Sequence, residues 1–342
     1  MVYSDLNNNQ IRNSINLQQT YNAYLDARSY LDHYKGGMSW KSVNGKEYLV
    51  KILNRNGSTK SMGPRSSDTE TKYNDFHTGK EEAKNRLNSL KEQLKEQMAI
   101  AKALKIGVVP NATIKILSRL NEAGVLGKNL LVIGTNAIYA YEAVAGVSFQ
   151  PEIMETTDID FLWDSRTKLR ICSSQNKSTI MSIIQKADKS FKKTHMSFRA
   201  VNKDGFLVDI VRVNEDLLSE PPSLGDSKDE FEPVPIPNLE WLLSSPKFEA
   251  TVIGVDGTPA KIVAPDPRAF ALHKLWLSEQ PDRDPAKKNR DRGQALAVIQ
   301  LVQDKFPFLK MDENFKKIFP KTVFKMEKVN SVLDDWDDDF DL

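Results

Sequence analysis

The sequence predicts an α+β protein whose mixed β-sheet core lies near residues 129–215. Three observations support this fold class. Two Asn-Gly dipeptides separate strand-like segments in the N-terminal third, and this dipeptide is a strong hairpin signal. Apolar strand-like runs alternate with helical patterns between residues 130 and 213, and helical spacing dominates the rest of the chain. Both element types are therefore expected, largely in separate regions.

Residues 1–128 are expected to form an N-terminal helical and β-hairpin region. Apolar residues at roughly helical intervals predict a first helix, which two glycines end near residue 36. The Asn-Gly turns at 44–45 and 56–57 then predict a three-stranded meander. Apolar residues at three-and-four spacing predict an amphipathic helix over residues 80–105, and "ATIKILSRLNEAG" predicts another helix closed by its glycine.

The region after the core is expected to begin with a proline-rich crossing loop or linker. The segments "DPRAFALHKLWLSEQ" and "RGQALAVIQLVQDKF" have helical apolar spacing, and the connector between them, "PDRDPAKKNRDR", is densely charged. Residues 216–332 are therefore predicted to be mostly helical. The aspartate-rich residues 333–342 are predicted to be a solvated, disordered tail.

Composition narrows the class of protein. The 48 basic and 46 acidic residues give a net charge of +2, so the average charge does not indicate a nucleic-acid or membrane binder. The single cysteine, Cys172, excludes an internal disulfide and a multi-cysteine metal cluster. The N-terminus lacks the apolar core of a signal peptide, and no apolar run approaches the ~20 residues that cross a bilayer. We therefore expect a cytoplasmic protein without a membrane segment.

The segment "TDIDFLW" places two carboxylates in an otherwise apolar, strand-like run. Side chains alternate along a strand, so Asp158 and Asp160 share one face while Ile159 and Phe161 share the other. The two aspartate Cα atoms would lie ~6.6 Å apart, where uncompensated carboxylates resist ionising together. A divalent cation removes this conflict, and Mg²⁺ (or Mn²⁺) suits carboxylate and phosphate oxygens. The pair therefore indicates phosphate chemistry.

A strand-to-helix turn precedes the aspartate pair. "LLVIG" predicts a strand and "TNAIYAYEAVAG" a helix, so Gly134, Thr135 and Asn136 form the turn between them. Such a turn directs backbone N–H groups and partial positive charge at an anion. Asp209, in the strand-like run "GFLVDIVRV", could approach the same face, or it could instead pair with Arg212. Three carboxylates could hold two metal ions ~3.5–4 Å apart.

The chain has, in order, a Gly-Thr turn, a helix, a "DID" strand and a later "VDI" strand. This order resembles that of the nucleotidyltransferases of the polymerase-β superfamily. More closely, "VIGTNAIYAYEAVAG", "TTDIDFLWDSR" and "HKLWLS" make about residues 20–310 similar to a bacterial family known only as nucleotidyltransferase-fold proteins. The resemblance implies a nucleotidyltransferase-like core in which Asp158 and Asp160 bind metal. It also implies that Asp209 completes the site and assists the attacking hydroxyl, and that Gly134 and Thr135 cradle the triphosphate.

The resemblance implies further contacts and one insertion. It implies that the helical part containing Lys274, Lys287 and Arg290 closes over the nucleotide, and a solvated basic surface is the alternative. Arg65, in "GPRSS", is expected to serve the acceptor or the triphosphate. The insert "GVSFQPEIMETT" must loop out if the turn and the aspartates are to meet.

The function implied by the resemblance is nucleotidyl transfer. An acceptor hydroxyl would attack the α-phosphorus of a metal-bound nucleoside triphosphate such as ATP, and pyrophosphate would leave. A tRNA end, a protein and a small molecule all stay open as acceptors. Two other classes also stay open: a nucleotide-binding regulator without turnover, and an RNA-binding or toxin-like protein whose basic connector grips phosphates.

Overall fold

The computed structural model describes residues 2–54, 57–154, 156–166, 179–214, 224 and 228–326. The chain folds into two compact units, one of Arg12–Ile106 and a second of Met1–Ile11 with Gly107–Leu342. Both contain helices and strands, which confirms the predicted α+β class. Cys172 and the aspartate-rich tail lie outside the described residues. Within the described residues, the structure contains no helix that combines the length and apolarity needed to cross a membrane.

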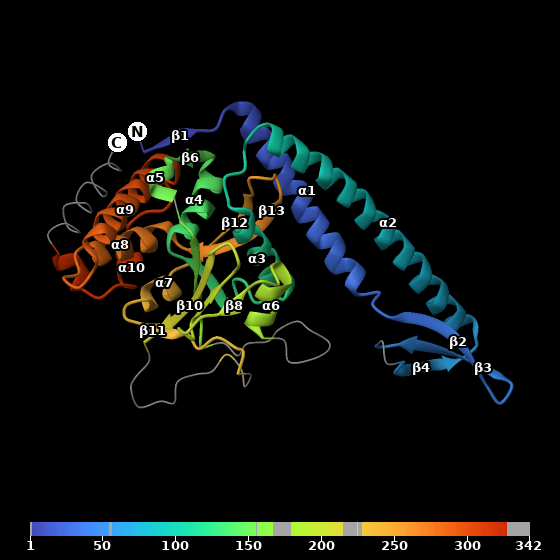
Figure 1. Ribbon diagram of the computed structural model, residues 1–342. Helices are drawn as coiled ribbons and strands as arrows, with labels where there is room; N and C mark the ends of the chain where they lie inside the picture. Colours follow the sequence, from blue (N-terminus) through green and yellow to red (C-terminus); the bar gives the residue numbers. More distant parts are fainter. Residues whose placement is uncertain are drawn as a thin grey trace. The chain divides into compact units, whose positions relative to one another are not determined.

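The unit Arg12–Ile106 contains two long helices and an antiparallel meander (Figure 1). Its elements are α1 (Asn8–Asp32, which begins in the other unit), β2 (Gly37–Val43), β3 (Lys46–Ile52), β4 (Thr59–Pro64) and α2 (Ser67–Ala103). The strand order β2-β3-β4 is that of the predicted meander. Asn44 and Gly45 join β2 to β3 with φ angles of 50° and 75°. These positive values belong to the tight hairpin turn that Asn-Gly favours.

Helix α2 begins at Ser67, well before the predicted start at Lys80. Ser66 is its N-cap: the Ser66 hydroxyl accepts a hydrogen bond from the Thr69 N–H, and the Thr69 hydroxyl accepts one from the Ser66 N–H. This reciprocal arrangement is a capping box, which satisfies N–H groups at a helix start. The first turns carry mostly polar residues, so apolar spacing placed the start too late.

The second unit is built on a mixed β-sheet (Figure 1). The strands of this sheet are β5 (Leu130–Ile133), β7 (Asp158–Trp163), β8 (Lys192–Lys193), β9 (Arg199–Val201), β10 (Leu207–Val213) and β11 (Val234–Ile236). Their order is β5-β7-β10-β9-β8, and β11 also pairs with β10. Strand β10 runs parallel to β7 and β11 but antiparallel to β9, and β5 runs antiparallel to β7.

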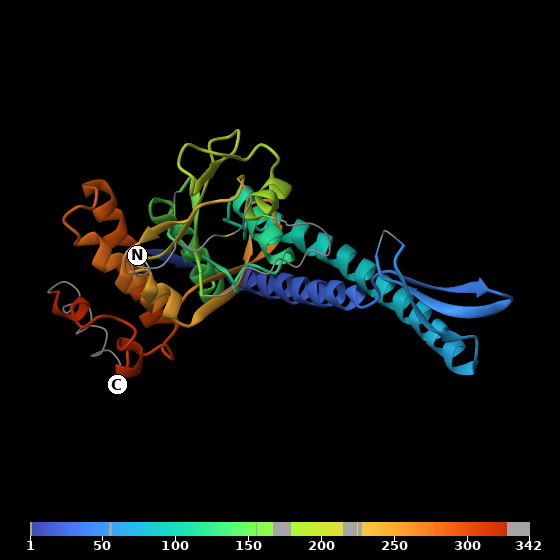
Figure 2. The ribbon, with the colours of Figure 1, turned by 90° about the horizontal axis from the view of Figure 1, so that it is seen from below.

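Helices and further strands surround the mixed sheet. They are β1 (Tyr3–Asp5), α3 (Asn111–Glu122), the 3₁₀ helix η1 (Thr135–Ala137), α4 (Ile138–Ala145), β6 (Val147–Phe149), α5 (Pro151–Met154), α6 (Ile180–Ala187), α7 (Glu240–Ser244), β12 (Lys247–Ile253), β13 (Pro259–Pro265), α8 (Pro267–Ser278), α9 (Pro285–Lys305), α10 (Glu313–Lys316) and the 3₁₀ helix η2 (Val323–Lys325). Helix α3 packs on α6 and β13, and α4 packs on β12. Helices α8 and α9, coloured orange in Figure 2, pack against each other.

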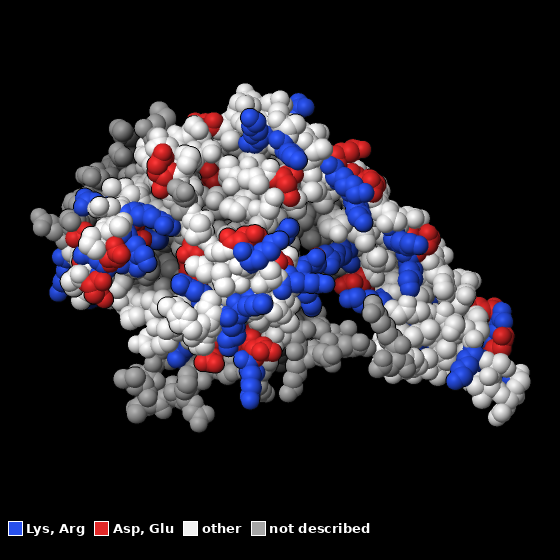
Figure 3. All heavy atoms as spheres, viewed as in Figure 1, with Lys and Arg blue, Asp and Glu red and all other residues white. Residues whose placement is uncertain are grey.

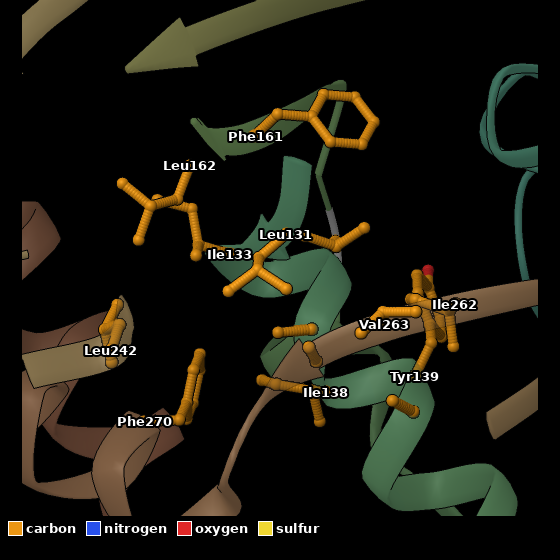
Figure 4. Packing of buried hydrophobic residues seen from close by; sticks show 14 of the residues in the cluster. Leu131, Ile133, Ile138, Tyr139, Phe161, Leu162, Leu242, Ile262, Val263 and Phe270 are labelled. Atoms are coloured by element: carbon orange, nitrogen blue, oxygen red, sulfur yellow. The ribbon is translucent and has the colours of Figure 1, made fainter. Parts of the chain in front are cut away.

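The hydrophobic core of this unit lies between the sheet and its helices (Figure 4). Every residue of β5 is buried, as are Phe161 and Leu162 of β7. Ile138 of α4, Ile262 of β13 and Phe270 of α8 belong to the same cluster. Burial of each such side chain contributes roughly 1.5–3 kcal/mol. The core therefore fixes β5, β7 and the turn between β5 and α4 relative to one another.

Two parts of this unit differ from the sequence prediction. The insert expected to loop out contains β6, which pairs antiparallel with β1, and the short helix α5. A β12-β13 hairpin lies in the region predicted to be mostly helical. Its turn contains Asp256 and Gly257, and the φ angle of Gly257 is 87°. Asp-Gly is a hairpin signal, so the sequence contained the information for this element.

Helix α9 begins at Pro285, so the charged segment predicted to be a connector is largely helical. The carboxylate of the N-cap residue Asp284 accepts a 2.8 Å hydrogen bond from the Ala286 N–H. Proline is favoured at the first helical position, and aspartate at the N-cap. Lys287 and Arg290 therefore extend from the first turns of a helix, where their directions are fixed by the backbone.

The buried carboxyl of Glu142 in α4 should make the free energy of unfolding depend on pH. It is buried, and its Oε1 accepts a 2.7 Å hydrogen bond from the Phe149 N–H. Burial raises the pKa of this carboxyl from 4.5 to about 7, so the folded chain favours its protonated form. Below the unfolded-state pKa of 4.5 the carboxyl is protonated in both states and does not oppose folding. As pH rises toward the folded-state pKa of about 7, ionisation in the unfolded chain lowers the stability of the fold. At about pH 8 we expect Glu142→Gln to unfold with a free energy greater than that of the parent by on the order of 1 kcal/mol or more.

Urea unfolding of parent and variant at several pH values tests this expectation. The advantage of Glu142→Gln should grow between about pH 4.5 and about pH 7 and then level off. Glu249→Gln, at an exposed carboxylate of β12, is the matched control. An advantage that stays constant with pH would show that the Glu142 charge does not oppose folding.

Candidate active site

A pocket of about 330 Å³ opens on the mixed sheet where β5 ends and β7 begins. Its lining brings together eight of the residues singled out from the sequence: Gly134, Thr135, Asp158, Asp160, Asp209, Lys274, Lys287 and Arg290. Arg199, Arg283 and Asp291 also line it. Carboxylates from the sheet therefore face cationic side chains from the C-terminal helices across one cavity.

Strand register brings the three carboxylates onto one face of the sheet. Asp160 of β7 lies directly opposite Asp209 of the parallel strand β10. Asp158 is two residues before Asp160, so its side chain is on the same face. Neighbouring strands are about 4.8 Å apart, which makes the three side chains close neighbours.

Gly134 allows the turn after β5 to approach the Asp160 carboxylate. Ile133 pairs with Asp160 across the antiparallel strands. The φ angle of Gly134 is 64°, and a Cβ atom at this position would lie 2.3 Å from Asp160 Oδ2. Any other residue would therefore both strain the backbone and displace the carboxylate. The group that approaches Gly134 in this structure is the Asp160 carboxylate.

Asn136 ties the same turn to the start of β7. Its side chain is buried, donates a 2.7 Å hydrogen bond to the Asp158 carbonyl and accepts a 3.3 Å bond from the Thr113 hydroxyl. The turn and the aspartates thus meet despite the structured insert between them. Asn136 fills a positioning role, with its amide directed at the backbone of β7.

The charge of Asp160 is destabilised by its surroundings. Desolvation in the pocket, together with the negative charges of Asp158 and Asp209, raises the pKa of Asp160 to about 7. Lys274 and Arg199 oppose this shift. Like charges at close range disfavour joint ionisation, so additional positive charge at this position would favour the fully ionised carboxylates.

Arg199 is the partner of Asp209. The Arg199 Nε and Nη2 atoms donate to the two Asp209 carboxylate oxygens at 2.7 and 2.6 Å. Strands β9 and β10 place these residues directly opposite each other. Arg212, the partner considered from the sequence, instead donates to the Val213 carbonyl. The "NKDG" segment before β10 is a hairpin signal that could have indicated the Arg199 pairing.

The cations on α8 and its following loop share one buried carboxylate. Asp291 of α9 is 2% exposed and forms ion pairs with Lys274 at 2.6 Å and Arg283 at 2.7 Å. Burial lowers the pKa of Lys274, and the Asp291 charge opposes that shift. Asp291 and Arg283 were not among the residues predicted from the sequence, although Asp291 follows Lys287 by one helical turn on α9.

Helix α9 also reaches the turn after β5. Arg290 and the Gln294 Nε2 both donate hydrogen bonds to the Thr135 hydroxyl oxygen, the latter at 3.0 Å. Gln294 Nε2 donates in addition to the Ile153 carbonyl of α5 at 2.8 Å. Gln294 is fully buried. No local sequence signal distinguishes Gln294 from the other polar residues of this helix.

Arg65 lies in the other unit. Its guanidinium forms ion pairs with Glu47 at 2.6 Å and Glu70 at 2.7 Å, and it lies over the Trp40 ring. All of these partners are close to the β2-β3-β4 meander. The contacts described for Arg65 thus connect elements of the N-terminal unit.

The pocket carboxylates have the chemistry of a divalent cation site. Among the described residues, no group of three or more His, Cys, Asp or Glu side chains is already arranged to hold a metal ion. Both carboxylate oxygens of Asp209 accept hydrogen bonds from Arg199. The pKa of Asp160 is nevertheless raised, first by desolvation and then by the charges of Asp158 and Asp209, and a bound cation would favour the ionised form. Carboxylate oxygens suit Mg²⁺ or Mn²⁺, so the donor set fits such an ion.

Comparison with known proteins adds an independent finding. The sequence profile of a nucleotidyltransferase family matches residues 111–319. Comparisons with the curated proteins and with the solved structures found no match. The matched segment contains the turn, the three aspartates and the cations of α8 and α9. Because it covers more than half of the chain, the protein belongs to this nucleotidyltransferase family.

Proposed function

We propose that the protein transfers a nucleoside monophosphate from a metal-bound nucleoside triphosphate to an acceptor hydroxyl and releases pyrophosphate. The observation that carries this proposal is the convergence of Asp158, Asp160 and Asp209 on one sheet face, beside the Gly134-Thr135 turn. A pocket of about 330 Å³ is within the usual range for small-molecule sites. We also propose that the chain is related to the polymerase-β superfamily.

The proposed division of labour follows the charges. Asp158 and Asp160 would hold Mg²⁺ or Mn²⁺. When bound, this ion would neutralise the carboxylates and the phosphate oxygens and stabilise charge on the departing pyrophosphate. Thr135, Lys287 and Arg290 line the same pocket as the carboxylates and would bind the triphosphate. Catalysis would rest on alignment and charge stabilisation, as in other phosphoryl and nucleotidyl transfers.

Asp209 would act on the acceptor. The acceptor oxygen forms a bond to the α-phosphorus, the bond from that phosphorus to the β-phosphate oxygen breaks, and pyrophosphate leaves with the electron pair. Asp209 would accept the proton of the attacking hydroxyl. A carboxylate has about four lone-pair sites, so the two bonds from Arg199 leave sites that can accept this proton.

The first test is loss of transfer in Asp158→Asn and Asp160→Asn. Each change removes a negative charge but keeps the size of the side chain, so transfer should be abolished while the fold stays intact. Thermal stability without metal should stay level or rise, because the repulsion that raises the pKa of Asp160 is reduced. The measurement is movement of label from each labelled nucleotide in cell extract with Mg²⁺. Transfer at the parental rate by both variants would refute the metal-site proposal.

Gly134→Ala should slow transfer by on the order of 10²-fold, because the added Cβ would displace Asp160 Oδ2, and misplacement of about 1 Å can cost that much. Gly146→Ala is the matched control. Gly146 also has a positive φ, of 67°, but a Cβ atom added there would lie 3.8 Å from its nearest neighbour, Ile11 Cγ1, which is an ordinary contact. Backbone strain should cost Gly146→Ala, whose φ and ψ angles of 67° and 38° are left-handed helical, about 1–2 kcal/mol of stability. It should cost Gly134→Ala, with φ and ψ angles of 64° and −159°, on the order of 1–3 kcal/mol. Equal transfer rates in the two variants would argue against a role for the Gly134 approach.

Asp209→Asn should keep Mg-ATP affinity within a few-fold yet reduce transfer by on the order of 10²-fold or more. The reason is that a proton acceptor for the attacking hydroxyl affects chemistry more than ground-state binding. Arg199→Gln is the matched control, since it breaks the same ion pair but keeps the carboxylate, and its loss should be smaller. A parent protein that binds Mg-ATP without any turnover would instead favour the regulator.

A further inference from the structure

The sheet face that carries the carboxylates continues into basic side chains. Directly opposite residues in neighbouring strands point to the same face. One such row runs from Asp160 to Asp209 and on to Arg199. The next row runs from Asp158 through Leu207 and Val201 to Lys192.

The basic end of these rows is at the sheet edge opposite the glycine turn. The order β5-β7-β10-β9-β8 places the turn after β5 at one side of the carboxylates and Lys192 of β8 at the other. Three strand spacings separate β7 from β8, which is about 14 Å. Of the three carboxylates, Asp209 is therefore the one closest to a ligand that enters over β8 and β9. Such a ligand would approach from the side opposite the proposed triphosphate site.

Two further exposed lysines lie beside Lys192. Lys189 precedes β8, and Lys203 lies in the turn between β9 and β10. The Lys203 N–H donates to the Ser190 hydroxyl at 3.1 Å, which joins the two loops. In Figure 3, Lys and Arg side chains gather over the region where Figure 1 labels β8 and α6.

Charge is concentrated in this part of a nearly neutral chain. Residues 185–205 contain six basic and two acidic residues, whereas the whole chain has a net charge of +2. Lysines on an edge strand also prevent pairing with other sheets. That role accounts for Lys192, but it does not account for Lys189 and Lys203, which lie outside the strands.

We propose that the acceptor is the 3′ end of a single-stranded polynucleotide, which reaches the pocket across β8 and β9. This inference rests on the proposed function and names its acceptor. Lys189, Lys192 and Lys203 would contact the phosphates, and Phe198, which lines the pocket, would stack on a base near the end. Positive grooves with aromatic stacking surfaces are the usual way to bind single strands. The terminal hydroxyl would lie at Asp209.

Binding of a fluorescent single-stranded RNA of about 12 nucleotides tests the inference. The variant is Lys189→Glu/Lys192→Glu/Lys203→Glu, with fluorescence anisotropy measured between about 50 and about 200 mM KCl. Each phosphate contact on a single strand contributes about 0.7 to the slope of log K against log salt. The triple variant should therefore lose about 2 units of slope and bind at least about tenfold more weakly at low salt.

The matched control is Lys310→Glu/Lys317→Glu/Lys321→Glu, which makes the same charge change at exposed positions after α9. It should bind RNA like the parent. Failure of the parent to bind RNA, or equal weakening in the two triple variants, would overturn the inference. Binding of a DNA strand of the same sequence shows whether the protein prefers RNA or DNA. If label moves to protein in cell extract, and moves at the same rate with Lys189→Glu/Lys192→Glu/Lys203→Glu as with the parent, the acceptor is a protein and the inference is wrong.

Binding of the four Mg-bound nucleoside triphosphates by the parent, measured separately, distinguishes the two levels of proposal. If one of them binds but RNA does not, the polynucleotide acceptor is wrong and the proposed nucleotidyl transfer stands. If none of the four Mg-bound nucleoside triphosphates binds, the proposed transfer is wrong whatever the RNA result. Incorporation of labelled nucleotide into RNA with a 3′-hydroxyl, and its loss with a 3′-deoxy end, would establish both.

Discussion

Repulsion among carboxylates is the constraint on which the rest of the pocket depends. Parallel pairing of β7 with β10 holds Asp160 beside Asp209, with Asp158 on the same face. The energy of three like charges in a partly dehydrated cavity must be offset by other groups. Strand β9 supplies Arg199, and helix α8 supplies Lys274. Strand β9 and the C-terminal helices are thus electrostatic parts of the same site.

Local sequence rules predicted the features that depend on a single segment. The period of two residues in a strand is enough to place Asp158 and Asp160 on one face, and an apolar run broken by Gly134 is enough to predict a strand-to-helix turn. The α+β class also followed, because hairpin signals and helical spacing occupy different regions. These inferences needed no knowledge of which segments are neighbours in space.

Features that depend on pairing between segments were beyond such rules. Arg199 contacts Asp209 because β9 and β10 have a specific register, whereas sequence proximity favoured Arg212. The sequence predicts that Gly134 lies close to a phosphate; the antiparallel pairing of β5 with β7, which no local rule indicates, brings the Asp160 carboxylate to the same glycine. Buried positions on α9, such as Gln294, have no local signal, because their importance comes from a turn about 160 residues earlier in the chain.

The hydrogen bonds around Thr135 give its hydroxyl group a fixed polarity. The Ile153 carbonyl can only accept, so it fixes the orientation of the Gln294 amide and directs Nε2 toward Thr135. Arg290 cannot accept either. Both bonds use lone pairs of the hydroxyl oxygen, so toward a third group the Thr135 hydroxyl can act only as a donor. At this position the pocket therefore offers a hydrogen-bond donor and no acceptor. Such a group suits an anionic oxygen and does not suit an ammonium or amide N–H group.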